Sequence, residues 1–152
     1  LDLIARKVPM RDFAGYKLFL AQIETTLNSA YHMSEIDVYA EKLAQSVHML
    51  KEVTTSVMRS SKDMSLDLVF SNSAAYLDMF GHITISWLWL KQAMVAQKAL
   101  NQGVHGDDVP FYKGKIQAMK FFINTELPKC NNWGNLVMKV DSTAFDMQPE
   151  WF

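Results

Sequence analysis

The sequence predicts an all-α protein, an up-and-down bundle of the four-helix type that ends in an apolar C-terminal tail. Three observations support this class. Apolar residues recur at helical spacing through almost the whole chain, no segment has the alternation of a half-buried strand, and no repeat, linker or low-complexity tract interrupts the pattern. A length of 152 residues is the size of one domain.

The composition excludes several classes of protein. With 49% hydrophobic residues and a net charge of −1, the chain is neither disordered nor a basic nucleic-acid binder. Residues 83–100, the most apolar stretch, include Lys91 and Lys98 and are too polar to span a membrane. The single cysteine, Cys130, cannot form an internal disulfide. It favours a reducing compartment, and we expect a cytoplasmic protein.

The first helical segments follow a break near the start of the chain. Residues 1–7 are typical of the last turns of a helix, and Pro9 with residues 12–15 marks a break or a cap. An amphipathic helix then follows, and its apolar stripe consists of Tyr16, Leu20, Ile23, Leu27 and Ala30.

A second helix is predicted to start at a capping box formed by Ser34 and Asp37. Its apolar residues are spaced as in a helix that lies along a bundle neighbour: Ile36, Ala40, Leu43, Val47, Leu50, Thr54 and Val57. The polar residues 59–63 are expected to form the connection that follows it.

The third region contains the longest predicted helix. Residues 64–70 form either a short helix capped by Ser65 or the beginning of the next one, for which residues 71–73 supply an alternative cap. From residue 74 to residue 100 apolar side chains occur on almost every face, so we expect a central helix, or one that another subunit or domain also covers. Gly103 is predicted to cap its C-terminus.

The fourth helix is predicted to carry Pro110 in its first turn, where a missing N–H costs nothing. Its core stripe is Tyr112, Ile116, Met119, Ile123 and Leu127. Pro128 is expected to kink or stop this helix, and residues 131–134 are either its end or a renewed turn.

The usual catalytic and metal-binding patterns are absent from the sequence. No Glu is followed three residues later by His, as a di-iron bundle requires, and no glycine-rich phosphate loop is present. Asp78 and His82 share one helix face and leave a small metal-binding bundle as an alternative, although His82 more simply bonds to Asp78 or to a carbonyl. Cys130 beside Lys129 is better explained as an ordinary free thiol than as a nucleophile. We therefore predict no catalytic, cofactor-binding or metal-binding residue in this chain.

Large apolar side chains instead suggest contact surfaces. Trp87 and Trp89 cannot share one helix face, so at least one of them is expected to face a second surface. The C-terminal tail is unusually rich in large apolar groups for a solvated end. The interface candidates are Trp87, Trp89, Phe145, Met147, Trp151 and Phe152. An alternative class of function is a free-standing interaction module that binds a partner helix or a hydrophobic ligand in a core rich in methionine, of which there are 10.

Three segments resemble acyl-CoA dehydrogenases that have an extended C-terminus. Residues 1–10, Leu-Asp-Leu-Ile-Ala-Arg-Lys-Val-Pro-Met, are similar to the segment that follows the catalytic Glu-Gly-Thr motif of these enzymes. Residues 76–81, Tyr-Leu-Asp-Met-Phe-Gly, resemble the long helix of their additional domain, and residues 111–128 resemble its last long helix. Bacterial enzymes of the 3-methylmercaptopropionyl-CoA dehydrogenase type are the most similar in this respect.

This resemblance implies a larger parent enzyme. That enzyme would bind FAD, remove the proton α to an acyl-CoA thioester with a carboxylate base and transfer the β hydride to the flavin. The base would precede Leu1, so no catalytic residue is carried over. Residues 1–10 would end the helix after the catalytic region and residues 11–152 would form the C-terminal bundle. The implied partners are the remaining domains of the polypeptide, a second subunit in a homo-oligomer and the acyl-CoA substrate.

Overall fold

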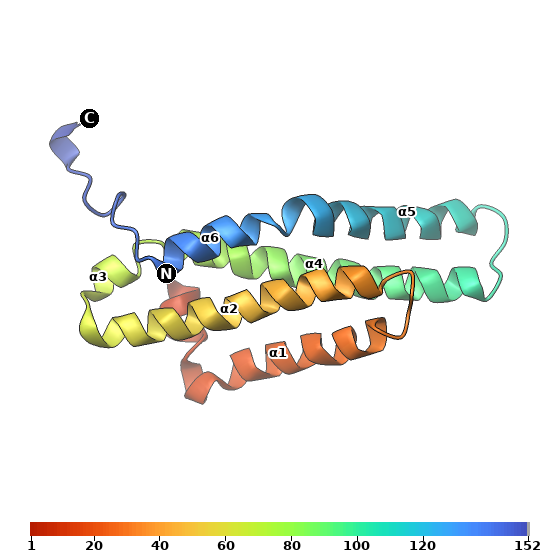
Figure 1. The fold of residues 1–152 in the computed structure, drawn as a ribbon, viewed down its shortest axis with the longest axis horizontal. Helices are drawn as coiled ribbons and strands as arrows, with labels where there is room; N and C mark the ends of the chain where they lie inside the picture. The colour runs from red at the N-terminus through yellow and green to blue at the C-terminus, as the bar shows by residue number, and fades with distance from the viewer. Residues whose placement is uncertain (152) are drawn as a thin grey trace.

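Four long helical rods, each antiparallel to the next along the chain, make up the computed structural model, which describes residues 1–151 (Figure 1). The first three rods are α1 (Met10–Ala30), α2 (Asp37–Asp63) and α4 (Ser73–Asn101). The fourth is composite and joins α5 (Asp108–Phe121), a π-helical turn (Phe122–Glu126) and α6 (Lys129–Met138). The predicted all-α, up-and-down bundle is confirmed.

Three short elements complete the described residues: a π-helical turn (Leu3–Lys7), the helix α3 (Leu66–Val69) between α2 and α4, and a 3₁₀ turn (Pro149–Trp151) in the tail. None of the helices in residues 1–151 is both long and apolar enough to cross a membrane.

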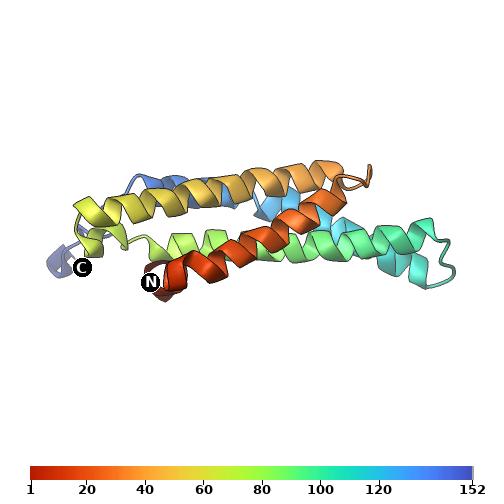
Figure 2. The same ribbon diagram turned by 90° about the horizontal axis from the view of Figure 1, so that it is seen from below.

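The core lies between the four rods because each rod places its predicted apolar stripe inward. Its largest fully buried side chains come from all four rods: Ile23, Leu43, Leu50, Tyr76, Met79, Ile83, Leu90, Met119, Ile123 and Leu127. Each such aliphatic side chain contributes about 1.5–3 kcal/mol when it leaves water. Figure 2 shows α2 and α4 on opposite sides of the bundle.

The predicted break before the first helix is confirmed and lies at Arg11, Asp12 and Phe13. These residues have positive φ angles of 51°, 53° and 62° inside the span of α1. Left-handed backbone costs about 1–2 kcal/mol for a residue other than glycine. The chain therefore turns sharply here before α1 continues along the bundle.

The predicted capping box at the start of α2 was wrong. The Ser34 hydroxyl donates to the Glu35 carboxylate over 3.3 Å, and α2 begins only at Asp37. The Asp37 carboxylate accepts a hydrogen bond from the backbone N–H of Val38. The backbone N–H of Asp37 donates to the Met33 carbonyl over 2.9 Å. Backbone turns after α1 thus already satisfy donors that the Ser34 side chain was expected to bind.

The predicted polar connection at residues 59–63 was also wrong, because these residues form the last turns of α2. The Ser61 hydroxyl donates back to the Met58 carbonyl over 3.0 Å, so this serine does not compete with the helix. The helix ends where Met64 becomes extended, with ψ of 165°. α3 is a separate helix, and neither Ser65 nor Asn72 forms the side-chain cap expected of it.

One glycine ends the third rod, and one proline kinks the fourth rod. Gly103 adopts φ of +83° just after α4, as a C-terminal cap requires. Pro128 kinks the rod as predicted: it follows the π-helical turn, which closes with the Leu127 N–H on the Phe122 carbonyl over 3.0 Å. Residues 131–134 are a renewed helix within α6.

Candidate interface

Trp87 is half-buried on the side of α4 that faces α1. Its indole N–H donates to the Thr26 hydroxyl over 2.8 Å, and its ring lies perpendicular to the Phe19 ring with centroids 5.9 Å apart. The Lys91 ammonium lies 5.1 Å from the centroid of the Trp87 ring. These contacts are internal to the chain, and the role of Trp87 in an interface stays a prediction.

Trp89 is half-buried on another side of α4, where α5 packs. The Lys115 ammonium of α5 lies 5.6 Å from the centroid of its ring. The two tryptophans therefore face different neighbours, as their spacing predicts. Like that of Trp87, the interface role of Trp89 stays a prediction.

A third side of α4 is uncovered and apolar. Leu77, Leu88 and Val95 are 53%, 46% and 64% exposed, and Ile85 beside them is 43% exposed. Spacings of 11 and 7 residues are close to whole numbers of helical turns, so these side chains lie along one line of the helix. We call these four residues the α4 stripe. α1, α2, α5 and α6 all pack against α4. The exposure of the four stripe residues shows that the stripe faces away from these neighbours.

A shallow apolar hollow extends the α4 stripe toward α5. It has a volume of about 320 Å³ and is lined by residues that include Val95, Ala96, Phe111 and Tyr112. Phe111 is 58% exposed. The sequence indicated that α4 is apolar on almost every side. It did not indicate that the side between α1 and α5 stays open, because that depends on how the rods are arranged.

The C-terminal tail, residues 141–151, leaves the bundle as an extended arm (Figure 1). Phe145, Met147 and Trp151 are 46%, 47% and 66% exposed. Phe152, the remaining interface candidate, lies outside the described residues. The apolar tail residues are thus available for a contact, and what they contact stays a prediction.

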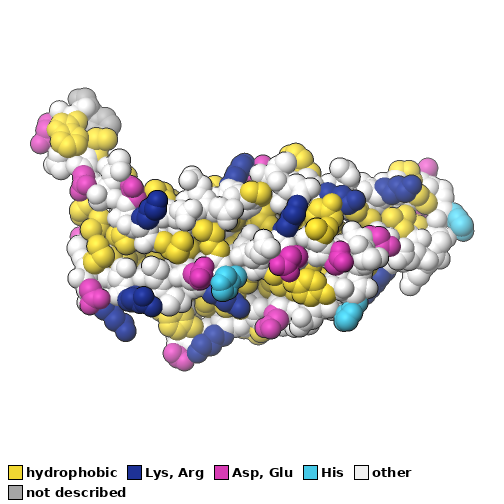
Figure 3. All heavy atoms as spheres, in the orientation of Figure 1, with side chains coloured by type: hydrophobic (Ala, Val, Ile, Leu, Met, Phe, Trp, Pro, Cys, Tyr) yellow, Lys and Arg dark blue, Asp and Glu magenta, His cyan; other side chains and the backbone are white. Residues whose placement is uncertain are grey.

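A groove of about 550 Å³ separates the first half of α1 from the second half of α2. Its apolar lining is Phe13, Tyr16, Leu20 and Met58, and its charged lining is Lys17, Lys51, Arg59 and Lys62. Lys17 pairs with Asp12 over 2.8 Å, whereas the other three cations form no ion pair within residues 1–151. Figure 3 shows Lys and Arg side chains beside apolar surface along the boundary of α1 and α2.

Beneath this groove lies a network of buried hydroxyls that the sequence did not indicate. The Thr54 hydroxyl donates to the Leu50 carbonyl over 2.7 Å. It therefore accepts from the Tyr76 hydroxyl over 2.8 Å, and it also accepts from Tyr16 over 3.3 Å. Burial raises the pKa of both phenols, so each stays protonated at neutral pH and can donate. The spacing of the apolar residues predicts only a place in the buried stripe of α2 for Thr54.

The metal alternative is not supported by the positions of Asp78 and His82. The His82 Nδ1 atom lies 2.9 Å from the Asp78 backbone carbonyl, and its Nε2 atom lies 3.6 Å from the Glu126 carboxylate. The ring also packs edge-on against Trp133, with centroids 4.7 Å apart. Within residues 1–151 no three His, Cys, Asp or Glu side chains converge as metal ligands do.

Cys130 is fully buried, and its thiol lies 3.7 Å from the Met79 carbonyl. Burial raises the pKa of the thiol to about 12, so the reactive thiolate is scarce at neutral pH. The prediction of an ordinary free thiol agrees with this environment.

Similarity to known proteins decides the family. The family model described as acetyl-CoA dehydrogenase C-terminal like matches residues 19–148. The chain belongs to this acyl-CoA dehydrogenase C-terminal family. It is also 29% identical over 120 residues to the broad-specificity linear acyl-CoA dehydrogenase FadE5 of Mycobacterium tuberculosis. That match covers 78% of this chain and 20% of the relative, so the chain spans about a fifth of that protein's length.

Membership of this family implies FAD in the parent enzyme, and the described residues do not fit that cofactor. The α1–α2 groove of about 550 Å³ is open, its polar lining consists of cations, threonines and the Tyr16 hydroxyl, and it offers no enclosed slot for a flavin ring. The one buried side-chain polar atom without a partner in residues 1–151 is the Ser86 hydroxyl oxygen, which is inside the core.

Proposed function

We propose that this chain is the C-terminal structural domain of a longer FAD-dependent acyl-CoA dehydrogenase, which forms the α,β double bond of an acyl-CoA thioester. The family match and the name of the relative support this function, since that relative is a linear acyl-CoA dehydrogenase. The catalytic base and the flavin pocket are then outside this chain. The comparisons do not support the 3-methylmercaptopropionyl-CoA subtype, and we propose no narrower substrate. We expect a homo-oligomer in the cytoplasm.

The observation that carries the structural role is the α4 stripe. A central bundle helix that leaves four large apolar side chains 43–64% exposed along one side has unburied surface suited to a further contact. The adjoining hollow against Phe111 enlarges that surface. We propose that the other domains of the same polypeptide cover it. The domain would then help to hold the catalytic domains in place.

The native gene product tests the family-level proposal. We expect a polypeptide several times longer than this chain, yellow with bound flavin, because the matched relative is about five times as long as the match. Intact mass and the visible absorption spectrum of protein isolated from source cells measure both properties. A colourless product of about one domain would contradict the proposal and favour the free-standing interaction module.

The α4 stripe gives a second prediction. Leu88→Asp in the full-length protein should lower its melting temperature by several degrees, because a carboxylate would be buried without a partner under the covering domain. Leu18→Asp is the matched control, since Leu18 is 62% exposed on α1 and away from the stripe. Its effect should stay within about 0.5 kcal/mol of the native protein, as is usual for surface substitutions. Equal, small shifts in thermal unfolding for both variants would show that the stripe is solvent-exposed in the parent.

A further inference from the structure

The tail and the α1–α2 groove have complementary chemistry. Residues 141–151 contain no Lys or Arg, and their acids are Asp141, Asp146 and Glu150. The exposed side chains Phe145 and Met147 lie between these acids, and the exposed Trp151 follows Glu150 directly. The tail is therefore an acidic segment with large apolar groups.

The groove offers the opposite charge over an apolar floor. Lys51, Arg59 and Lys62 line it and are without an acidic partner in the part of the chain that the structure describes. No acidic residue is among the residues that line it. Its volume of about 550 Å³ lies within the usual range for binding pockets. An acidic, aromatic segment would place its side chains on the floor and its carboxylates at the rim.

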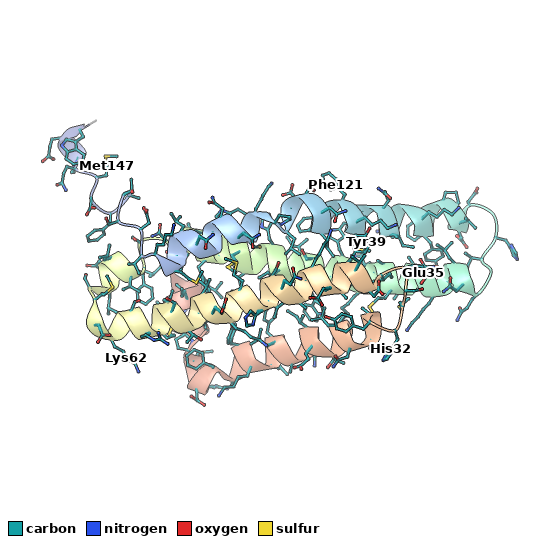
Figure 4. The ribbon with its side chains drawn as sticks, viewed as in Figure 1. His32, Glu35, Tyr39, Lys62, Phe121 and Met147 are labelled. Carbon is teal, nitrogen blue, oxygen red and sulfur yellow. The ribbon has the colours of Figure 1, made fainter. Side chains whose placement is uncertain are left out.

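The geometry directs the tail away from the groove of its own chain. The Asn72 amide, at the start of α4, donates to the Asp141 carbonyl over 2.8 Å and anchors the base of the tail. Val140, with φ of 50°, turns the chain outward just before it. Figure 4 shows Met147 and Lys62 on opposite sides of the bundle end, with α2 and α3 between them. A second copy of the chain is thus the occupant that this arrangement favours.

We propose that the tail of one copy lies in the α1–α2 groove of a second copy. Asp146 and Glu150 pair with the rim cations, and Met147 and Trp151 cover the apolar floor. The exchange is reciprocal when the two copies are related by a two-fold axis. This proposal deepens the homo-oligomer proposed above and rests on it. It predicts a contact that weakens as salt is raised, because its ion pairs are at a solvent-exposed rim.

Cross-linking between labelled copies of the full-length protein tests this contact. Isotopically heavy protein with Met147→Cys is mixed with light protein with Thr55→Cys, since Thr55 is exposed and lines the groove. We expect a disulfide that joins a heavy chain to a light chain, identified by mass. Thr125→Cys, exposed on the fourth rod, replaces Thr55→Cys in the control and should cross-link little.

Charge reversal makes the test specific. Adding Asp146→Lys and Glu150→Lys to the heavy chain should reduce the yield of the Met147–Thr55 cross-link about tenfold, since two exposed ion pairs become two repulsions. Adding Arg59→Glu and Lys62→Glu to the light chain should restore it. A yield no higher than that of the Thr125 control would overturn the proposal, as would disulfides that join only heavy to heavy or light to light chains.

Sedimentation of the unmodified protein separates the two ways in which the inference can fail. If sedimentation shows an oligomer but the Met147–Thr55 cross-link does not form, the tail contact is overturned and the proposed homo-oligomer stands. If sedimentation shows a monomer and the cross-link does not form, both proposals are overturned.

Discussion

Replacing Gly134 with valine is expected to lower the free energy of unfolding by about 1–3 kcal/mol, because α6 approaches α2 too closely for a branched side chain. A Cβ atom at Gly134 would lie 2.7 Å from the Met49 Cε atom and 3.3 Å from the Val53 Cγ2 atom. The terminal methyl of Met49 can move aside, but Val53 is fully buried and has no free space. Urea unfolding followed by circular dichroism measures the change.

Two alanine variants separate packing from helix propensity. Gly114→Ala in α5 meets no atom within 4 Å, so it should stabilise the chain by up to about 1 kcal/mol through propensity alone. Gly134→Ala gains the same propensity but must displace Met49, and it should be clearly less favourable. If Gly134→Val were as stable as the native chain, the close approach of α6 to α2 would be wrong.

Thr54→Val should cost about 1–3 kcal/mol of stability, because it removes the acceptor of a fully buried phenol. The side chains have nearly the same shape, so the change tests hydrogen bonding rather than volume. Without the Thr54 hydroxyl, Tyr76 loses its 2.8 Å partner at a site with 0% exposure. Tyr16 is partly exposed at the groove and can donate to water instead. Chemical denaturation of the native chain and of Thr54→Val under identical conditions gives the difference in their free energies of unfolding.

Tyr76→Phe is the informative control for this network. It should cost less than Thr54→Val, because Thr54 still donates to Leu50 and accepts from Tyr16. The burial that raises the pKa of Tyr76 also implies a pH effect. Above about pH 10 the unfolded phenol ionises while the folded one does not, so stability falls as the pH rises. Tyr76→Phe should be less sensitive to alkali, and equal sensitivity would argue against the buried network.

The helices were predictable because their signals are local. Ile23 and Leu27 in α1, or Leu43 and Leu50 in α2, repeat at helical spacing, and a helix with one apolar side must bury that side against a neighbour. Helix ends were harder to predict. The Ser34–Asp37 cap failed because backbone turns at Met33 had already satisfied the same donors.

The candidate interface was only partly predictable. The spacing of Trp87 and Trp89 indicated that they face different sides, and they pack against α1 and α5 respectively. The outward-facing line through Leu77, Leu88 and Val95 was hidden, because α4 is apolar on nearly every side. The hydroxyl network around Thr54 was hidden for a related reason: its three members come from α1, α2 and α4.

The sequence by itself therefore determined the all-α class, the order of the rods and the break points at Pro128 and Gly103, since each depends on the periodicity or backbone chemistry of neighbouring residues. Only the tertiary structure decided which side of α4 stays open, that Gly134 must be small, and that the groove cations and the acidic tail lie apart in one chain. Those properties depend on distances between residues far apart in sequence, which are set by how whole helices pack and not by the pattern along any one of them.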